Sequence, residues 1–125
     1  MATVRYIVSD VNQATTFYTT YLGFTLDQQM GSAFARIRKG NLELWLSGPE
    51  SSASRAMPDG RQPQPGGWNR LVIEVEDIVG LIKKLKHAGI LFRNDIVVGP
   101  GGKQTVLEDP SGNPIELFEP ARTDI

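Results

Sequence analysis

The sequence has no cysteine and a single histidine, His87. Without thiols the chain cannot form a disulfide framework, a thiolate nucleophile, an iron–sulfur cluster or a cysteine-based zinc site. One histidine also falls short of the imidazole ligands that zinc, nickel and non-haem iron sites usually contain. Because His87 follows three lysines, Lys83, Lys84 and Lys86, at the end of a predicted helix, we expect it at the surface, where a cation favours the helix dipole.

The sequence has no marked excess of positive or negative charge and no long hydrophobic run. The 13 Lys and Arg residues against 14 Asp and Glu residues give a formal net charge of −1. That charge provides no long-range field for nucleic acid or an anionic membrane, so we expect neither as a partner. No segment approaches the ~20 apolar residues of a membrane span, and Met1 to Asp10 lacks the pattern of a signal peptide. We therefore expect a cytoplasmic protein.

What the sequence does contain is a repeated order of elements. In each half, an alternating run of apolar residues ends at an aspartate, Asp10 or Asp77, placed to cap the helix that follows. Both predicted helices end at a glycine, Gly23 or Gly89, which suits a left-handed helix end. The chain then becomes extended in both halves, at Phe24–Leu26 and at Ile90–Phe92.

Each half continues with a predicted hairpin. The turns Gly40-Asn41 and Gly112-Asn113 begin closing strands that each carry one glutamate, Glu43 and Glu116. The strands before the turns are predicted at Ala33–Arg38 and Lys103–Glu108. The pattern predicts an α+β fold made of two copies of βαβββ within one domain at 1–125. The predicted parts are module one at 3–47, a loop at 48–68, module two at 69–119 and a tail at 120–125.

The segment between the modules, Ser47 to Trp68, is rich in glycine, proline and serine. A loop of this length inside a compact domain is usually a lid, a binding loop or a disordered connector. Met57, Arg55, Arg61 and Trp68 favour the binding interpretation, since a solvated spacer does not need them. The connector interpretation stays open beside it.

The chain resembles the vicinal oxygen chelate superfamily, which includes glyoxalase I, bleomycin-resistance proteins and extradiol dioxygenases. The resemblance extends from Val4 to Pro120 and is carried by four segments: Val8–Val11, Phe17-Tyr18, Leu22–Phe24 and Asp109–Leu117. It implies two βαβββ modules whose mixed sheets curl around an open cavity, a small-molecule ligand and a homodimer. The fold hosts isomerases, lyases, dioxygenases and drug-binding proteins, so the resemblance predicts the architecture better than the reaction.

The resemblance also implies where a metal would bind. In metal-dependent members a histidine lies seven residues before the aspartate that starts each helix, and a glutamate lies in each closing strand. The corresponding residues here are Thr3, Arg70, Glu43 and Glu116. Neither histidine is present, and a guanidinium at Arg70 would repel a cation. We expect no cofactor; a Mg²⁺ or Mn²⁺ site built from the two glutamates and water is the alternative.

Alternation in the closing strands predicts which side chains share a face. In Leu42–Leu46 a period of two places the leucines on one face and leaves Glu43 and Trp45 on the other. By the same rule Glu116 and Phe118 share a face. Arg5 and Arg70 of the first strands would project toward these glutamates, so structural Arg–Glu ion pairs are an alternative to a ligand site.

The candidate ligand-binding residues are aromatic, apolar and charged side chains that would line one cleft: Arg5, Phe34, Glu43, Trp45, Met57, Trp68, Arg70, Glu116 and Phe118. A mostly apolar lining with a few convergent polar groups is typical of small-molecule sites. The hypothesis is metal-independent binding or sequestration of an amphipathic ligand or drug. The alternative is a lyase, isomerase or dioxygenase with an atypical metal site or with Glu116 as a general base, since a buried carboxylate can act as one.

Overall fold

The computed structural model describes residues 2–122, which form two compact units. Unit 1 contains the residues up to Gly66 together with Pro110–Asn113, and unit 2 contains Gly67–Asp109 together with the residues from Pro114 onward. Of the predicted tail, 123–125 lie outside the described residues, and strand β8 includes Pro120. No described helix is long and apolar enough to cross a membrane.

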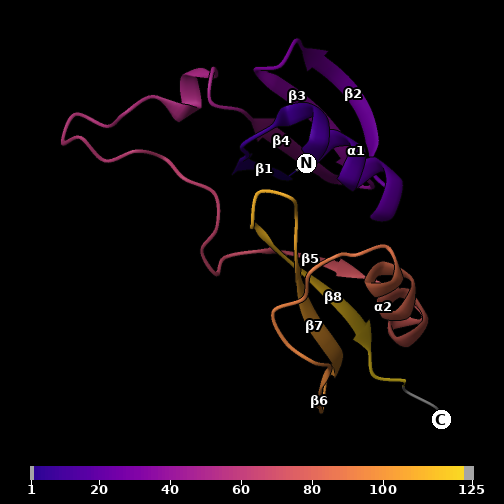
Figure 1. Cartoon of the computed structure of the whole chain (residues 1–125). Helices are drawn as coiled ribbons and strands as arrows, with labels where there is room; N and C mark the ends of the chain where they lie inside the picture. The colour runs from indigo at the N-terminus through magenta and orange to yellow at the C-terminus, as the bar shows by residue number, and fades with distance from the viewer. Residues whose placement is uncertain (1, 123–125) are drawn as a thin grey trace. The chain divides into compact units, whose positions relative to one another are not determined.

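Unit 1 is a four-stranded mixed sheet with one α-helix and one short 3₁₀ helix among its described residues (Figure 1). The sheet order is β1-β4-β3-β2, in which β1 and β4 run parallel and the other neighbours run antiparallel. Its elements are β1 (Ala2–Ile7), α1 (Val11–Tyr21), β2 (Thr25–Met30), β3 (Phe34–Lys39), β4 (Leu42–Ser47) and the short 3₁₀ helix η1 (Ser52–Ser54).

Unit 2 repeats this topology (Figure 1). The order β5-β8-β7-β6 again pairs the first strand of the module in parallel with the last. Its elements are β5 (Leu71–Glu74), α2 (Ile78–His87), β6 (Val97–Gly99), β7 (Gly102–Glu108) and β8 (Pro114–Pro120). The prediction of an α+β fold built from two tandem βαβββ modules is therefore confirmed.

The predicted helix boundaries are confirmed as well. The Asp10 carboxylate accepts a hydrogen bond from the backbone N–H of Gln13, and the Asp77 carboxylate accepts one from Gly80. Each helix is followed by a glycine with positive φ, +75° at Gly23 and +85° at Gly89. A side chain would strain that backbone conformation, so glycine is the residue suited to these helix ends.

One predicted extended segment is wrong in its position. Ile90–Phe92 forms only an isolated bridge, between Phe92 and Leu107, and the edge strand of this sheet is β6, at Val97–Gly99. Backbone hydrogen bonds from Arg93 N to Val106 O and from Glu108 N to Leu91 O hold the segment beside β7. The segment therefore lies beside the sheet without forming a regular strand.

The cores confirm the predicted alternation in the closing strands. Leu44 and Leu46 are fully buried and share their sheet face with Ile37, on the side that α1 covers. Ile115 and Leu117 of β8 are likewise fully buried, on the side that α2 covers. Because successive side chains of a strand point to opposite faces, each sheet presents its remaining side chains on the face away from its helix.

The long segment after β4 is fixed at both ends within unit 1. At its start, the hydroxyls of Ser51 and Ser54 donate to the carbonyl of Gly48. At its end, the buried Asn113 side chain accepts from the backbone N–H of Gly66 and donates to the carbonyl of Ile7. These contacts order its ends, and they identify a structural role for Asn113 beyond its expected place in a turn.

Candidate functional site

The helix-free face of the unit 1 sheet gathers aromatic and charged side chains at its centre. Register places Arg5 of β1 and Arg36 of β3 opposite Trp45 of β4. Phe34 and Glu43 share this face because they lie two residues from Arg36 and Trp45 in their strands. We call these five residues, Arg5, Phe34, Arg36, Glu43 and Trp45, the Trp45 cluster.

The indole of Trp45 is held by three neighbours. The Arg5 guanidinium carbon lies 4.9 Å from the indole centroid, and the Phe34 ring meets it edge-on at a centroid distance of 5.7 Å and an interplanar angle of 76°. The indole Nε1 donates to Glu43 Oε1 at 2.9 Å. Cation–π, edge-to-face and hydrogen-bond contacts together fix the orientation of this half-buried ring before any ligand arrives.

The charge pairing of Glu43 differs from the sequence hypothesis. Its partner is Arg36, whose Nε lies 3.1 Å from Glu43 Oε1, and not Arg5. Arg5 instead donates from Nη1 to the hydroxyl of the fully buried Ser47, at 2.9 Å. Register places both Arg5 and Arg36 opposite Trp45; Arg36 reaches Glu43, while the Arg5 guanidinium lies over the indole.

A second ion pair lies farther along β3. Arg38 pairs with Asp27 of β2, beside a register irregularity between Leu26 and Gln28. The hydrogen bond and charge of Asp27 raise the pKa of Arg38 above its ordinary value. Asp27, like Glu43, is therefore already bound to an arginine of its own sheet.

In unit 2, the Glu116 carboxylate is bound to an arginine, as the ion-pair alternative predicted. Arg70 Nε and Nη2 lie 3.0 and 2.9 Å from Glu116 Oε1, and Glu116 is only 8% exposed. Arg70 Nη1 also donates to the carbonyl of Trp68, at 3.2 Å. A carboxylate this deeply buried requires such a partner, since an unpaired charge in the interior is costly.

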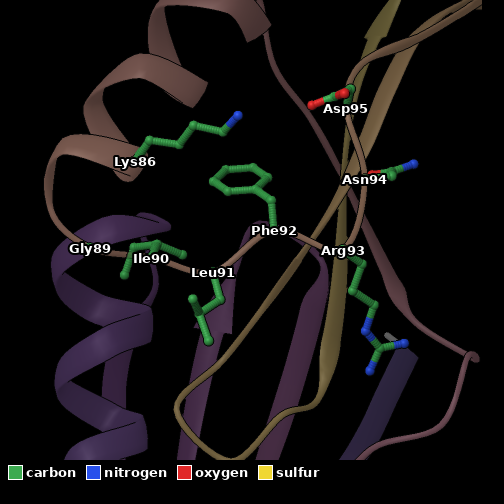
Figure 2. Close-up of a pocket in the computed structure, with 8 residues that line it drawn as sticks. All are labelled: Lys86, Gly89, Ile90, Leu91, Phe92, Arg93, Asn94 and Asp95. Carbon is green, nitrogen blue, oxygen red and sulfur yellow. The ribbon is translucent and has the colours of Figure 1, made fainter.

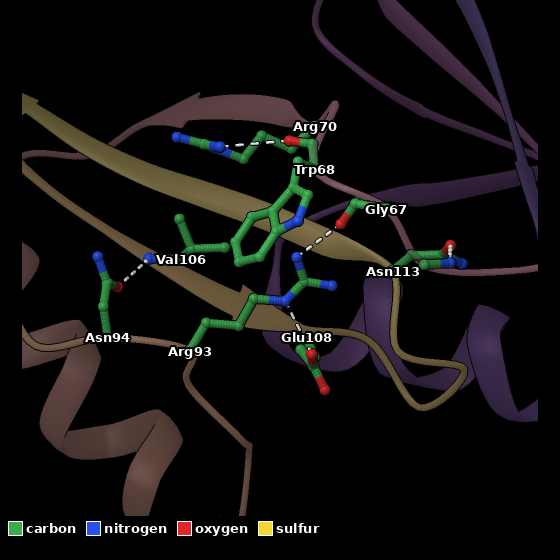
Figure 3. A network of polar contacts seen from close by, with 9 residues as sticks. Gly67, Trp68, Arg70, Arg93, Asn94, Val106, Glu108 and Asn113 are labelled. Carbon is green, nitrogen blue, oxygen red and sulfur yellow. Dashed lines mark hydrogen bonds and ion pairs between the residues drawn. The ribbon is translucent and has the colours of Figure 1, made fainter.

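A further network in unit 2 surrounds the exposed indole of Trp68 (Figure 3). Arg93 lies over this ring, with its guanidinium carbon 4.5 Å from the centroid. Its Nε lies 2.8 Å from Glu108, and its Nη1 donates to the carbonyl of Gly67 at 2.6 Å. Arg93 was not predicted as a site residue because it lies in the irregular segment before β6, where periodicity gives no signal.

Two grooves in unit 2 flank this irregular segment. One, of about 590 Å³, extends from Lys86 to Asp95, and the Lys86 ammonium lies 5.5 Å from the Phe92 ring centroid (Figure 2). The other, of about 580 Å³, adjoins Trp68 and Glu108. Both are shallow and open, and Trp68 is the one predicted site residue that lines either of them.

The structure brings together some of the predicted site residues and separates others. In unit 1, Arg5, Phe34, Glu43 and Trp45 form one cluster. Met57 lies in a tight turn, where its N–H donates to Arg61 O and its carbonyl accepts from Gly60 N. A smaller pocket of unit 1, about 210 Å³, lies where β1 ends against the prolines of the long segment.

The remaining predicted residues all belong to unit 2. Arg70 and Glu116 are in direct contact, and Trp68 joins them through its carbonyl. Phe118 is half-buried on the same face of β8 as Glu116, opposite Gln104 of β7.

The four residues at the positions implied for a metal do not form a suitable donor set. In unit 1, Thr3 offers one hydroxyl opposite Glu43, whose Oε1 is bound to an arginine and an indole N–H. In unit 2, Arg70 is itself a cation and occupies Glu116. Metal ions need deprotonated or neutral donors with free lone pairs, so these residues do not fit one. Within 2–122 no group of three or more His, Asp and Glu side chains is arranged for a metal.

The protein is of the α+β class and consists of two βαβββ modules, each with one α-helix packed on its sheet. The chain belongs to the glyoxalase/bleomycin resistance protein/dioxygenase superfamily, whose family model matches residues 1–117. No curated protein sequence gives a significant match.

Solved structures extend the similarity over nearly the whole chain. A member of the same superfamily from Sphaerobacter thermophilus is 27% identical, covers 95% of each chain and has a TM-score of 0.74. TnmS3, an antibiotic-binding protein from Streptomyces sp. CB03234, is 25% identical over 95% of this chain and 93% of its own, with a TM-score of 0.71. Lactoylglutathione lyase from Agrobacterium tumefaciens is 19% identical over 95% and 92%, with a TM-score of 0.72, a likeness that shows the fold alone.

Proposed function

We propose that the protein binds an amphipathic small molecule at the Trp45 cluster and sequesters it without a metal and without transforming it. The observation that carries this proposal is the half-buried indole of Trp45, fixed among Arg5, Phe34 and Glu43 on the sheet face opposite to α1. Aromatic surface with a few oriented charges is the usual lining of a small-ligand site. The similarity to an antibiotic-binding protein supports the same class of ligand.

Fixed side chains favour binding because little entropy is lost when the ligand arrives. Trp45 makes contacts to three of its neighbours, so its rotamer is already restricted in the free protein. Immobilising a flexible side chain on binding costs about 0.5–1.5 kcal/mol, and a preorganised ring avoids most of that cost. The cluster is therefore suited to a planar group placed against the indole and the Phe34 edge.

The pairing of the two glutamates with arginines supports metal-independent binding. A metal ion at Glu43 or Glu116 would lie beside the guanidinium of Arg36 or Arg70, which is bound to Oε1 of that glutamate and would repel a cation. The enzymatic alternative assigns Glu116 as a general base; because both Arg70 contacts go to Oε1, the proton would be accepted by Oε2. Formation of a product from a bound compound would favour that alternative over sequestration.

Replacing Trp45 with alanine is expected to weaken ligand binding by about tenfold or more, because the aromatic contact surface and the packing of Arg5 and Phe34 are lost together. The measurement is isothermal titration of neutral, anionic and cationic two-ring aromatic compounds, each with and without EDTA. We expect saturable binding that EDTA does not change.

Two matched variants control this experiment. Trp45→Phe keeps a ring and is expected to keep most of the affinity, while Val98→Ala changes an exposed side chain of unit 2 and is expected to have no effect. Equal affinity of Trp45→Ala and the unaltered protein would exclude the cluster as the binding site. Binding that disappears with EDTA and returns with a divalent ion would exclude metal independence.

The resemblance to the superfamily also leads us to propose a homodimer, and dilution tests it. If folding and association are coupled, the melting temperature falls by several degrees over an about 100-fold dilution, since mass action favours the separated chains. Light scattering at the higher concentration should then give twice the chain mass. A monomer mass with a melting temperature independent of concentration would refute the dimer.

A further inference from the structure

We infer that the ligand of the Trp45 cluster is a planar organic acid whose carboxylate pairs with Arg5. This inference rests on the proposed function and specifies the ligand's charge. The observation behind it is that Arg5 is the charged residue of the Trp45 cluster without an ion-pair partner in the described part of unit 1.

The charges on this part of the sheet do not cancel. Arg36 is paired with Glu43, and Arg38 is paired with Asp27. Arg5 contacts the Ser47 hydroxyl and the Trp45 ring, so within the described part of unit 1 it has no carboxylate partner. Three arginines against two carboxylates leave one positive charge, and that charge is on Arg5.

The two modules differ at this point. In unit 2 the arginine that immediately precedes the first strand, Arg70, is bound to the glutamate of the closing strand, Glu116. In unit 1 the position equivalent to Arg70 holds Thr3, the corresponding glutamate, Glu43, pairs with Arg36 of β3, and Arg5 of β1 has no carboxylate partner in the described part of the unit. Arg5 is therefore not required to neutralise a buried carboxylate, and its guanidinium is available to an anion from outside.

The contacts of Arg5 position it for such a ligand. Only Nη1 is engaged, by a serine that is itself fully buried, and the stacked indole restrains the plane of the guanidinium. The remaining N–H groups can form the parallel pair of hydrogen bonds that guanidinium makes with carboxylate. An acid group held there would place an attached ring beside Trp45 and Phe34.

A cationic ligand fits the same surface poorly. Both nearby carboxylates are already paired with an arginine, so their negative charge is largely compensated and attracts a further cation weakly. It would also approach the unpaired charge of Arg5. A neutral planar molecule would gain the aromatic contacts alone, so we expect the order of affinity to be acid, then neutral compound, then cation.

Three probes of one shape separate these cases by isothermal titration: 2-naphthoate, 2-naphthalenemethanol and protonated 2-naphthylmethylamine. We expect 2-naphthoate to bind about tenfold tighter or more than the alcohol, as hydrogen bonds between charged groups predict. In Arg5→Gln that preference should disappear, while the affinity for the alcohol stays within about twofold. In Arg38→Gln, which removes the same charge from the same sheet, the preference should persist.

The outcomes distinguish the ligand class from the proposed function. If the alcohol binds and 2-naphthoate binds no tighter, or if Arg5→Gln keeps the preference, the acid assignment is overturned and the binding face stands. If none of the three probes binds, both are overturned. If Arg5→Gln lowers the melting temperature, Arg5→Lys replaces it in the experiment. Lysine keeps the positive charge but lacks the planar guanidinium, so the preference for 2-naphthoate over the alcohol should fall by about threefold or more.

Discussion

Replacing Arg70 with alanine is expected to lower the free energy of unfolding by about 2 kcal/mol. The variant removes both guanidinium contacts to Glu116 Oε1 and leaves a carboxylate that is 8% exposed without its partner. The loss comes mainly from the Glu116 charge that stays buried without a partner. Removing one partner of a buried ion pair costs more free energy than the intact pair contributes to stability. Urea denaturation followed by circular dichroism measures it.

The double variant Arg70→Ala with Glu116→Gln is the control for this interpretation. If Glu116 has a structural role, neutralising it should recover a large part of the stability lost in the single variant, and Glu116→Gln alone should leave small-molecule binding unchanged. If the double variant is less stable than Arg70→Ala, the buried carboxylate is not the origin of the loss. Loss of a catalytic turnover in Glu116→Gln would instead assign the glutamate to the enzymatic alternative.

Replacing Gly102 with alanine is expected to lower the stability by about 3 kcal/mol or more. Gly102 begins β7 with φ at +146°, a conformation that a residue with a side chain rarely adopts. Its added Cβ would overlap the backbone carbonyl oxygen of Glu119 and lie 3.0 Å from Pro120 Cα, on the strand that carries Glu116. Backbone cannot move aside as a flexible side chain can, so the β7–β8 pairing would have to shift.

The matched control is Gly101→Ala, one residue earlier in the same hairpin turn. A Cβ there meets no atom within 4 Å and its φ is not positive, so we expect a change of about 0.5 kcal/mol or less. Urea midpoints of the two variants give the comparison directly. Similar midpoints would show that the close contact at Gly102 relaxes without cost.

The sequence by itself determined the features that depend on neighbours along the chain. Asp10 and Asp77 cap their helices through backbone N–H groups three residues ahead, which is a local interaction. Alternation likewise predicted that Glu43 and Trp45 share a face, because the pleat of a strand has a period of two. The repeated order of such local signals was sufficient to predict two βαβββ modules.

The tertiary structure alone decided which distant groups meet. Register places Arg5 and Arg36 alike, opposite Trp45, yet Glu43 pairs with Arg36 because Arg5 is held by the Ser47 hydroxyl and the indole. The contact of Arg93 with Trp68 arises in an irregular segment without a periodic pattern. The unpaired charge of Arg5, and with it the ligand class inferred here, became visible only in the folded sheet, because an ion pair is a distance between side chains and not a spacing in the chain.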